Sequence, residues 1–169
     1  MGSSLFMEKN MLVISGASNP DLAEKIAYYL KCQFVKANTE IFLDLELRVC
    51  IDVPVKGEEI LLVQSTTKPA NDHLMELLLL ADTVRRVGAK RVVAVIPYYG
   101  YGRQDRPSYQ YGPISAKLVA SLLKTVGIDH VITVDLHSCQ SEGFFDMGVS
   151  NLDLTNLMKE CMHQQPIDV

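Results

Sequence analysis

Two kinds of apolar pattern alternate along this chain of 169 residues. Short continuous runs of Val, Ile and Leu predict buried strands, at residues 11–15, 60–63, 91–96 and 131–134. Between these runs, apolar residues recur every three or four positions and predict helices, at residues 19–30, 71–87, 113–127 and 152–162. Repeated strand, helix and strand units predict an α/β fold in three layers, a parallel sheet with helices on both faces.

Residues at the expected helix ends support these ranges. Asn19 is a favourable N-cap, and Pro20 suits the first helical position. Asn71 or Asp72 is expected to cap the second helix, and Gly88 to end it. The helices therefore have start and stop signals where the apolar period changes.

The segment from Phe42 to Ile51 follows a period of two, which predicts a strand. Such a strand would place Phe42, Asp44 and Glu46 on one face. An ordinary half-buried strand with a polar outer face explains this pattern. The functional alternative is a purine site, because the aromatic ring can stack on a base and the carboxylates can accept hydrogen bonds from its exocyclic amine.

The net charge of −4 is unevenly distributed. Between Thr83 and Lys124, eight basic residues stand against one acidic residue. Four of the basic residues lie near the expected helix end at residue 87, where cations oppose the helix dipole. Arg103 and Arg106 instead lie in a glycine-punctuated loop, residues 97–112, which follows a strand and precedes a helix. An anionic ligand such as a phosphate would bind there, at the carboxyl edge of a parallel sheet.

Asp135 and His137 directly follow the next predicted strand, level with that loop. A single histidine is more often a turn residue than a ligand, and helix capping is a sufficient explanation for His73. The position of His137 beyond a central strand favours coordination of a nucleotide-bound cation. Asp135 could equally orient the imidazole.

Composition narrows the class of protein. No window is apolar for long enough to span a bilayer. Residues 1–10 lack the features of a signal peptide, and we expect them to be a disordered leader outside the domain. We therefore expect a cytoplasmic protein. We expect no membrane and no nucleic acid as a partner. The cysteines are widely spaced and are expected to be reduced and mostly buried: Cys32, Cys50, Cys139 and Cys161.

Four segments together resemble the ribose-phosphate pyrophosphokinase (phosphoribosyl pyrophosphate synthetase) family. They are residues 64–78, 96–106, 113–120, and 134–137 with 143–146. The resemblance covers nearly the whole chain and implies a phosphoribosyltransferase-like α/β domain. It also implies transfer of the pyrophosphoryl group of ATP to ribose 5-phosphate, giving phosphoribosyl pyrophosphate and AMP, with Mg²⁺ as cofactor. A homo-oligomer, usually a hexamer in the full-length family, is the implied assembly.

The same resemblance implies roles for particular residues. The family's Phe-x-Asp-Gly-Glu adenine-contacting motif corresponds to Phe42, Asp44, Leu45 and Glu46. Arg103 and Gln104 fall on its ATP-binding Arg-Gln pair, and His137 matches its magnesium-binding histidine. No catalytic residue is identified in this half, and phosphoryl-type transfer asks a protein mainly for positioning and charge neutralisation.

The chain also departs from the family pattern. Leu45 stands where the family has glycine, so we expect either an altered turn at the adenine contact or a leucine that simply extends the strand. Residues 107–112 read Pro-Ser-Tyr-Gln-Tyr-Gly where the family usually has a basic loop. The family's second domain carries a further metal-binding aspartate, a flexible loop with catalytic Lys and Arg, and the ribose 5-phosphate loop, and none of these motifs occurs here. We therefore expect residues 11–169 to be a single domain equivalent to the amino-terminal half, inactive alone, with the C-terminal domain absent.

Two classes of function remain open at this point. The first is the ATP-binding half of the enzyme, and the second is a non-catalytic, synthetase-like module that regulates or assembles with full-length subunits. A dinucleotide-binding domain is disfavoured, because Ser15-Gly16-Ala17-Ser18 follows the first strand in place of a Gly-x-Gly-x-x-Gly turn.

Overall fold

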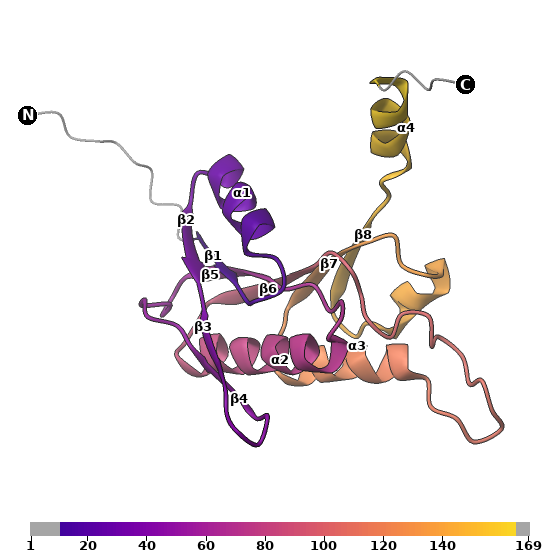
Figure 1. Cartoon of the computed structure of the whole chain (residues 1–169), viewed down its shortest axis with the longest axis horizontal. Coiled ribbons are helices and arrows are strands. Elements are labelled where there is room, and N and C mark those ends of the chain that lie inside the picture. Colours follow the sequence, from indigo (N-terminus) through magenta and orange to yellow (C-terminus); the bar gives the residue numbers. More distant parts are fainter. Residues whose placement is uncertain (1–10, 165–169) are drawn as a thin grey trace, which may run out of the picture.

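The computed structural model describes residues 11–164 and confirms the expected α/β fold (Figure 1). Six parallel strands form one sheet in the order β2-β1-β5-β6-β7-β8. Its strands are β1 (Met11–Ser15), β2 (Gln33–Lys36), β5 (Glu59–Val63), β6 (Arg91–Ile96), β7 (His130–Val134) and β8 (Gly148–Leu152). A separate antiparallel hairpin pairs β3 (Asn38–Ile41) with β4 (Leu47–Cys50).

Helices cover both faces of the sheet, as the continuous apolar strands predicted. The helices of the described residues are α1 (Pro20–Leu30), α2 (Ala70–Arg86), α3 (Ser115–Thr125), α4 (Thr155–Gln164) and the 3₁₀ helix η1 (Cys139–Phe144). Figure 1 shows α1 on one face, α2 and α3 on the other, and α4 extending away from the sheet beyond β8. No helix within residues 11–164 is long and apolar enough to cross a membrane.

The two faces of the sheet carry separate cores. Ile14, Leu62 and Ala94 belong to the larger core, which includes Leu77 and Leu80 of α2. Val13 and Val63 point the other way and pack with Ala23 and Ala27 of α1. Each fully buried Val, Leu or Ile contributes about 1.5–3 kcal/mol relative to an exposed one, so both faces drive assembly of the layers.

The structure corrects the prediction of one strand from Phe42 to Ile51. The chain reverses between β3 and β4, where the N–H of Leu45 donates to the Phe42 carbonyl (2.9 Å) and the N–H of Phe42 to the Glu46 carbonyl (2.9 Å). Leu45 has a φ of 70°. These features define a three-residue hairpin loop with a bulge that favours glycine at the left-handed position. Leu45 therefore occupies a turn and does not extend a strand. Leu43 and Leu45, which continue the apolar alternation across the turn, are both exposed.

Other boundaries also differ from the expectations. α2 begins at Ala70, directly after Pro69, so neither Asn71 nor Asp72 is its N-cap. α3 begins at Ser115 and α4 at Thr155, each a little later than predicted. The edge strands β2 and β8 were missed. The expectation of mostly buried thiols was wrong, since three of the free cysteines are exposed: Cys50, Cys139 and Cys161.

Candidate functional site

The loop of residues 97–112 begins tightly packed against the loop between β5 and α2. The N–H of Gly100 donates to the Thr66 hydroxyl (2.6 Å), which in turn donates to the Tyr98 carbonyl (2.9 Å). A Cβ atom at position 100 would lie 2.5 Å from the Thr66 carbonyl oxygen. Glycine is required there by close approach of two backbones, which holds the start of the loop at the carboxyl edge of the sheet.

Gln104 is anchored where this loop meets α3. Its side-chain Oε1 accepts a hydrogen bond from the Ser115 hydroxyl (2.7 Å), and its backbone carbonyl accepts one from the Ala116 N–H (3.2 Å). The neighbouring Arg103 is exposed and forms no ion pair within residues 11–164. The pair therefore combines a fixed amide with a guanidinium that is available to an anion.

Three adjoining open cavities share Arg103. One, of about 410 Å³, is also lined by Gln104 and by Lys68. Another, of about 420 Å³, is lined by Arg106 and His137. The third, of about 320 Å³, includes His137 again. The structure thus brings together the Arg103, Gln104 and His137 positions at the ends of β6 and β7, as expected from strands that finish at one edge.

Lys68 was not singled out from the sequence. It lies in the loop after β5 and before α2, at the same sheet edge as Arg103. The signal that identified the Arg103 loop, a basic residue between a buried strand and a helix, applies equally to Lys68. Lys68 is therefore the second cationic side chain, with Arg103, in the cavity that Gln104 lines.

A sharp turn presents Asp135 and His137 together after β7. Asp135 has a φ of 44°, in the left-handed region that Asp tolerates better than most residues. The turn is held by hydrogen bonds from the Asp135 N–H to the Leu152 carbonyl (3.0 Å) and from the Leu136 N–H to Asn151 Oδ1 (3.0 Å). Asp135 and His137 both line the cavity of about 320 Å³.

This pair supplies too few ligands for a cation by itself. No group of three or more His, Cys, Asp or Glu side chains within the described part of the chain is arranged to hold a metal ion. Mg²⁺ commonly takes one or two protein carboxylates together with phosphate oxygens and water. Asp135 with His137 therefore fits a metal shared with a phosphate ligand, and does not fit a closed structural metal site.

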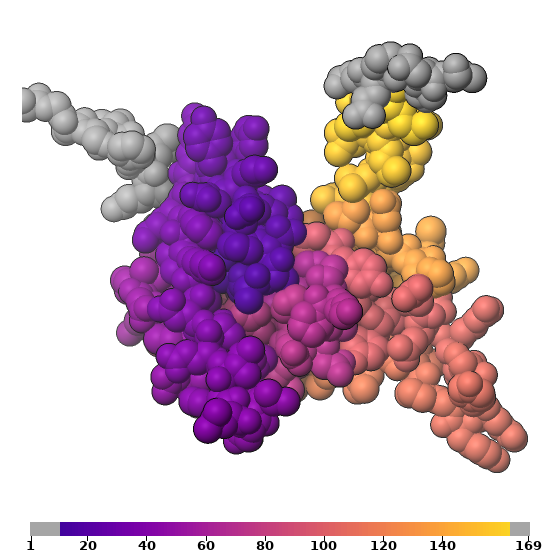
Figure 2. Space-filling model, viewed as in Figure 1, coloured from indigo at the N-terminus to yellow at the C-terminus, as the bar shows by residue number. Residues whose placement is uncertain are grey.

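The hairpin residues lie apart from these cavities. Phe42, Asp44 and Glu46 line none of the three that contain Arg103. In Figure 2 the hairpin (purple) and the loop of residues 97–112 (salmon) form separate protrusions at opposite sides of the domain. Within residues 11–164, the hairpin residues and the Arg103 loop therefore line no common cavity among these three.

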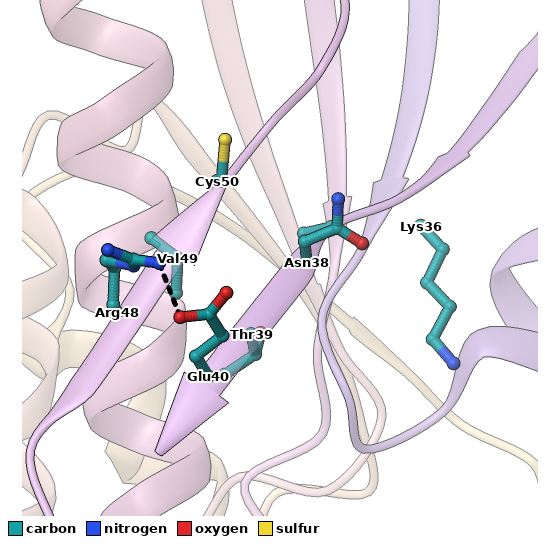
Figure 3. A pocket seen from close by; sticks show the side chains of 8 residues that line it. Lys36, Asn38, Thr39, Glu40, Arg48, Val49 and Cys50 are labelled. Atoms are coloured by element: carbon teal, nitrogen blue, oxygen red, sulfur yellow. Dashed lines mark hydrogen bonds and ion pairs between the residues drawn. The ribbon is translucent and has the colours of Figure 1, made fainter. Parts of the chain in front are cut away.

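The hairpin borders a different cavity, of about 730 Å³ (Figure 3). There Arg48 forms an ion pair with Glu40 (2.5 Å), and its guanidinium lies 5.5 Å from the centroid of the Phe42 ring. Cys50 also lines the cavity, and the pKa of its thiol is raised, first by its hydrogen bond to Asp52 and then by the charge of that carboxylate. A raised pKa lowers the thiolate fraction, so Cys50 lacks the character of an activated nucleophile.

Comparisons with known proteins agree on the family. Residues 11–127 match the family described as the N-terminal domain of ribose phosphate pyrophosphokinase. The ribose-phosphate pyrophosphokinase of Maricaulis maris is 50% identical over 149 residues, which are 88% of this chain and 48% of that protein. That of Agrobacterium fabrum is 51% identical over 142 residues, 84% of this chain and 46% of that protein.

A solved structure is similar in fold as well as in sequence. The phosphoribosylpyrophosphate synthetase from Mycobacterium smegmatis matches with a TM-score of 0.88 and 37% identity, covering 93% of this chain and 53% of that chain. The chain spans about half the length of the curated relatives it matches. By sequence and by fold, the chain belongs to the ribose-phosphate pyrophosphokinase family and corresponds to the family's N-terminal domain.

Proposed function

We propose that this chain is the ATP-binding part of a ribose-phosphate pyrophosphokinase, which transfers the pyrophosphoryl group of ATP to ribose 5-phosphate. The observation that carries the proposal is the convergence of Arg103 and His137 on shared cavities at the carboxyl edge of the sheet. Anionic ligands of α/β folds bind at this edge. Family membership supports the same chemistry.

The residues at this edge divide the work of holding a polyphosphate. Arg103 and Lys68 would neutralise phosphate oxygens, and Gln104 would orient the ligand through its side-chain amide. His137 and Asp135 would hold Mg²⁺, which supplies neutralisation of the phosphate charge when bound. Such transfers depend mainly on positioning and electrostatic stabilisation, which are the roles that we assign to these residues.

In this proposal, a second copy of the chain supplies the contact to adenine. Phe42 is 43% exposed, and it lies with Asp44 and Glu46 on a protruding hairpin outside every Arg103 cavity. The proposal places this hairpin against the Arg103 edge of a neighbouring copy, which makes a homo-oligomer part of it. The site for ribose 5-phosphate and the catalytic side chains would lie mostly outside this half. The cytoplasmic location expected from the sequence stays a prediction.

Titration of the chain with ATP and Mg²⁺ tests the proposal. Arg103→Ala should weaken binding by about tenfold or more, because a charge-assisted contact to phosphate is lost. Arg86→Ala is the matched control, since Arg86 is an exposed arginine that pairs with Asp82 on α2. Equal affinity of both variants and the unmodified chain would contradict the assignment of Arg103.

The same titration addresses the second candidate function, a non-catalytic module that assembles with full-length subunits. The observation that favours it is the loop of residues 107–112, where Tyr109 and Tyr111 are 82% and 92% exposed in place of basic residues. Absence of ATP binding together with retained assembly would support the module. Saturable binding that depends on Arg103 would support the enzyme half.

A further inference from the structure

A buried polar network lies beneath the hairpin and centres on Glu76 of α2. Glu76 is 2% exposed. Its Oε1 accepts hydrogen bonds from the Thr39 hydroxyl (2.5 Å) and the Ala17 N–H (3.1 Å), and its Oε2 accepts one from Gln64 Nε2 (2.5 Å). Within residues 11–164 no Lys, Arg or His forms an ion pair with Glu76. Three hydrogen-bond donors satisfy this side chain in place of a cation.

Gln64 gives the network a fixed direction. Its Nε2 donates to Glu76 and to the His73 carbonyl (3.3 Å). Its Oε1 accepts from the N–H (3.1 Å) and the hydroxyl (2.8 Å) of Ser18. Rotating the amide would place its NH₂ group against the Ser18 N–H and its oxygen against the Glu76 and His73 oxygens, so Gln64 can satisfy its neighbours in one orientation only. A Cβ at Gly16 would lie 2.5 Å from Gln64 Oε1, which leaves no room for a side chain above it.

The network joins elements that are distant in the sequence. Ala17 and Ser18 follow β1, Gln64 follows β5, Thr39 belongs to β3, and Glu76 to α2. Within the described residues, Thr39 to Glu76 is the one side-chain hydrogen bond between the hairpin strands and α2. Apolar packing also joins them, through Val49 against the main core. Such packing is not directional, whereas a hydrogen bond to a buried carboxyl group fixes position and angle.

We propose that Glu76 is a positioning residue, which through Thr39 fixes the angle of the β3–β4 hairpin relative to the loops at the carboxyl edge of the sheet. Thr39 lies three positions before Phe42, so the bond acts close to the residues of the adenine contact. The consequence for ligand binding rests on the proposed function. The effect on the hairpin itself does not.

Thr39→Val and Thr39→Ser form a matched pair for the test. Valine keeps the shape of threonine and removes the hydroxyl, whereas serine keeps the hydroxyl and removes a methyl group. In hydrogen–deuterium exchange, Thr39→Val should speed exchange of the hairpin amides by about tenfold and leave those of β5 and β6 unchanged. The same variant should weaken binding of ATP with Mg²⁺ by about fivefold. Thr39→Ser should restore both properties to within about twofold.

Two outcomes would overturn the positioning role. One is a Thr39→Val chain whose hairpin amides exchange at the same rate as those of the unmodified chain. The other is a Thr39→Ser chain that behaves like Thr39→Val, because the methyl group and not the hydroxyl would then matter. If the unmodified chain fails to bind ATP, the proposed function fails, and the exchange measurement still decides whether Thr39 and Glu76 hold the hairpin.

Discussion

Replacement of Leu45 by glycine should stabilise this protein. Leu45 sits at the left-handed position of the β3–β4 turn, with a φ of 70°. Only glycine adopts this conformation without a steric penalty, because a Cβ atom crowds the following carbonyl oxygen. The turn hydrogen bonds that require the conformation are made by the backbone of Phe42, Leu45 and Glu46, so they survive the substitution.

The size of the effect follows from three opposing contributions. Relief of the left-handed conformation should contribute about 1.5 kcal/mol. The greater freedom of glycine in the unfolded chain should cost about 0.7 kcal/mol. Leu45 is 79% exposed, so the loss of its burial should cost only about 0.4 kcal/mol. The net gain in the free energy of unfolding is about 0.4 kcal/mol, or a rise in Tm of about 1–2 °C.

Leu43→Gly is the control, because Leu43 lies in the same turn, is fully exposed, and has no positive φ. It carries the entropic cost of glycine without relief of strain, so its Tm should fall by about 1–3 °C. Thermal unfolding of the three proteins by circular dichroism gives the comparison. A Leu45→Gly chain that loses as much stability as Leu43→Gly would refute the reasoning.

Two further predictions concern the carboxyl edge and its support. Gly100→Ala should destabilise the fold by about 1–3 kcal/mol, because its Cβ would meet the Thr66 carbonyl oxygen at 2.5 Å. Gly143→Ala is the control, because a Cβ at Gly143 would meet nothing within 4 Å. It should change the free energy of unfolding by less than about 0.5 kcal/mol. Equal denaturant midpoints for these two variants would contradict this account. Burial raises the pKa of Tyr99. Above a pH of about 10, this tyrosine therefore ionises in the unfolded chain but not in the folded chain. The free energy of unfolding should then fall by up to about 1.4 kcal/mol for each unit of rising pH. Tyr99→Phe removes the hydrogen bond from the tyrosine hydroxyl to the Ala116 carbonyl and should lower the free energy of unfolding by about 1 kcal/mol at neutral pH. In urea unfolding, this variant should nevertheless lose stability less steeply above a pH of about 10. A slope equal to that of the unmodified chain would contradict the assignment.

The parts of the fold that the sequence predicted well are those with continuous apolar runs. β1, β5, β6 and β7 lie in the interior of the sheet, where each pairs with a strand on both edges and nearly every residue is apolar. The edge strand β2 has exposed polar ends, and β8 contains Gly148, Ser150 and Asn151, so neither shows such a run. Edge strands form because a neighbouring strand offers hydrogen bonds, and that partner is not visible in a local pattern.

The candidate site divides in the same way. Arg103 and His137 were predicted to meet because both follow central strands, and parallel strands end at one edge. Lys68 follows the same rule and was overlooked. The place of Phe42 could not be predicted, because it depends on a hairpin whose turn is hidden by an uninterrupted alternation of apolar residues.

The class of fold and the family motifs at Arg103 and His137 can be recognised in the sequence alone, and local polarity with strand order also predicts the sheet edge at which we propose that an anion binds. Tertiary structure alone decided that the hairpin stands apart from this edge, that Leu45 adopts a left-handed turn, and that Glu76 is buried among three donors. Those features arise where distant segments pack against one another. The periodicity of a segment does not show which other segment it packs against, so the shape of the site follows only from the assembled fold.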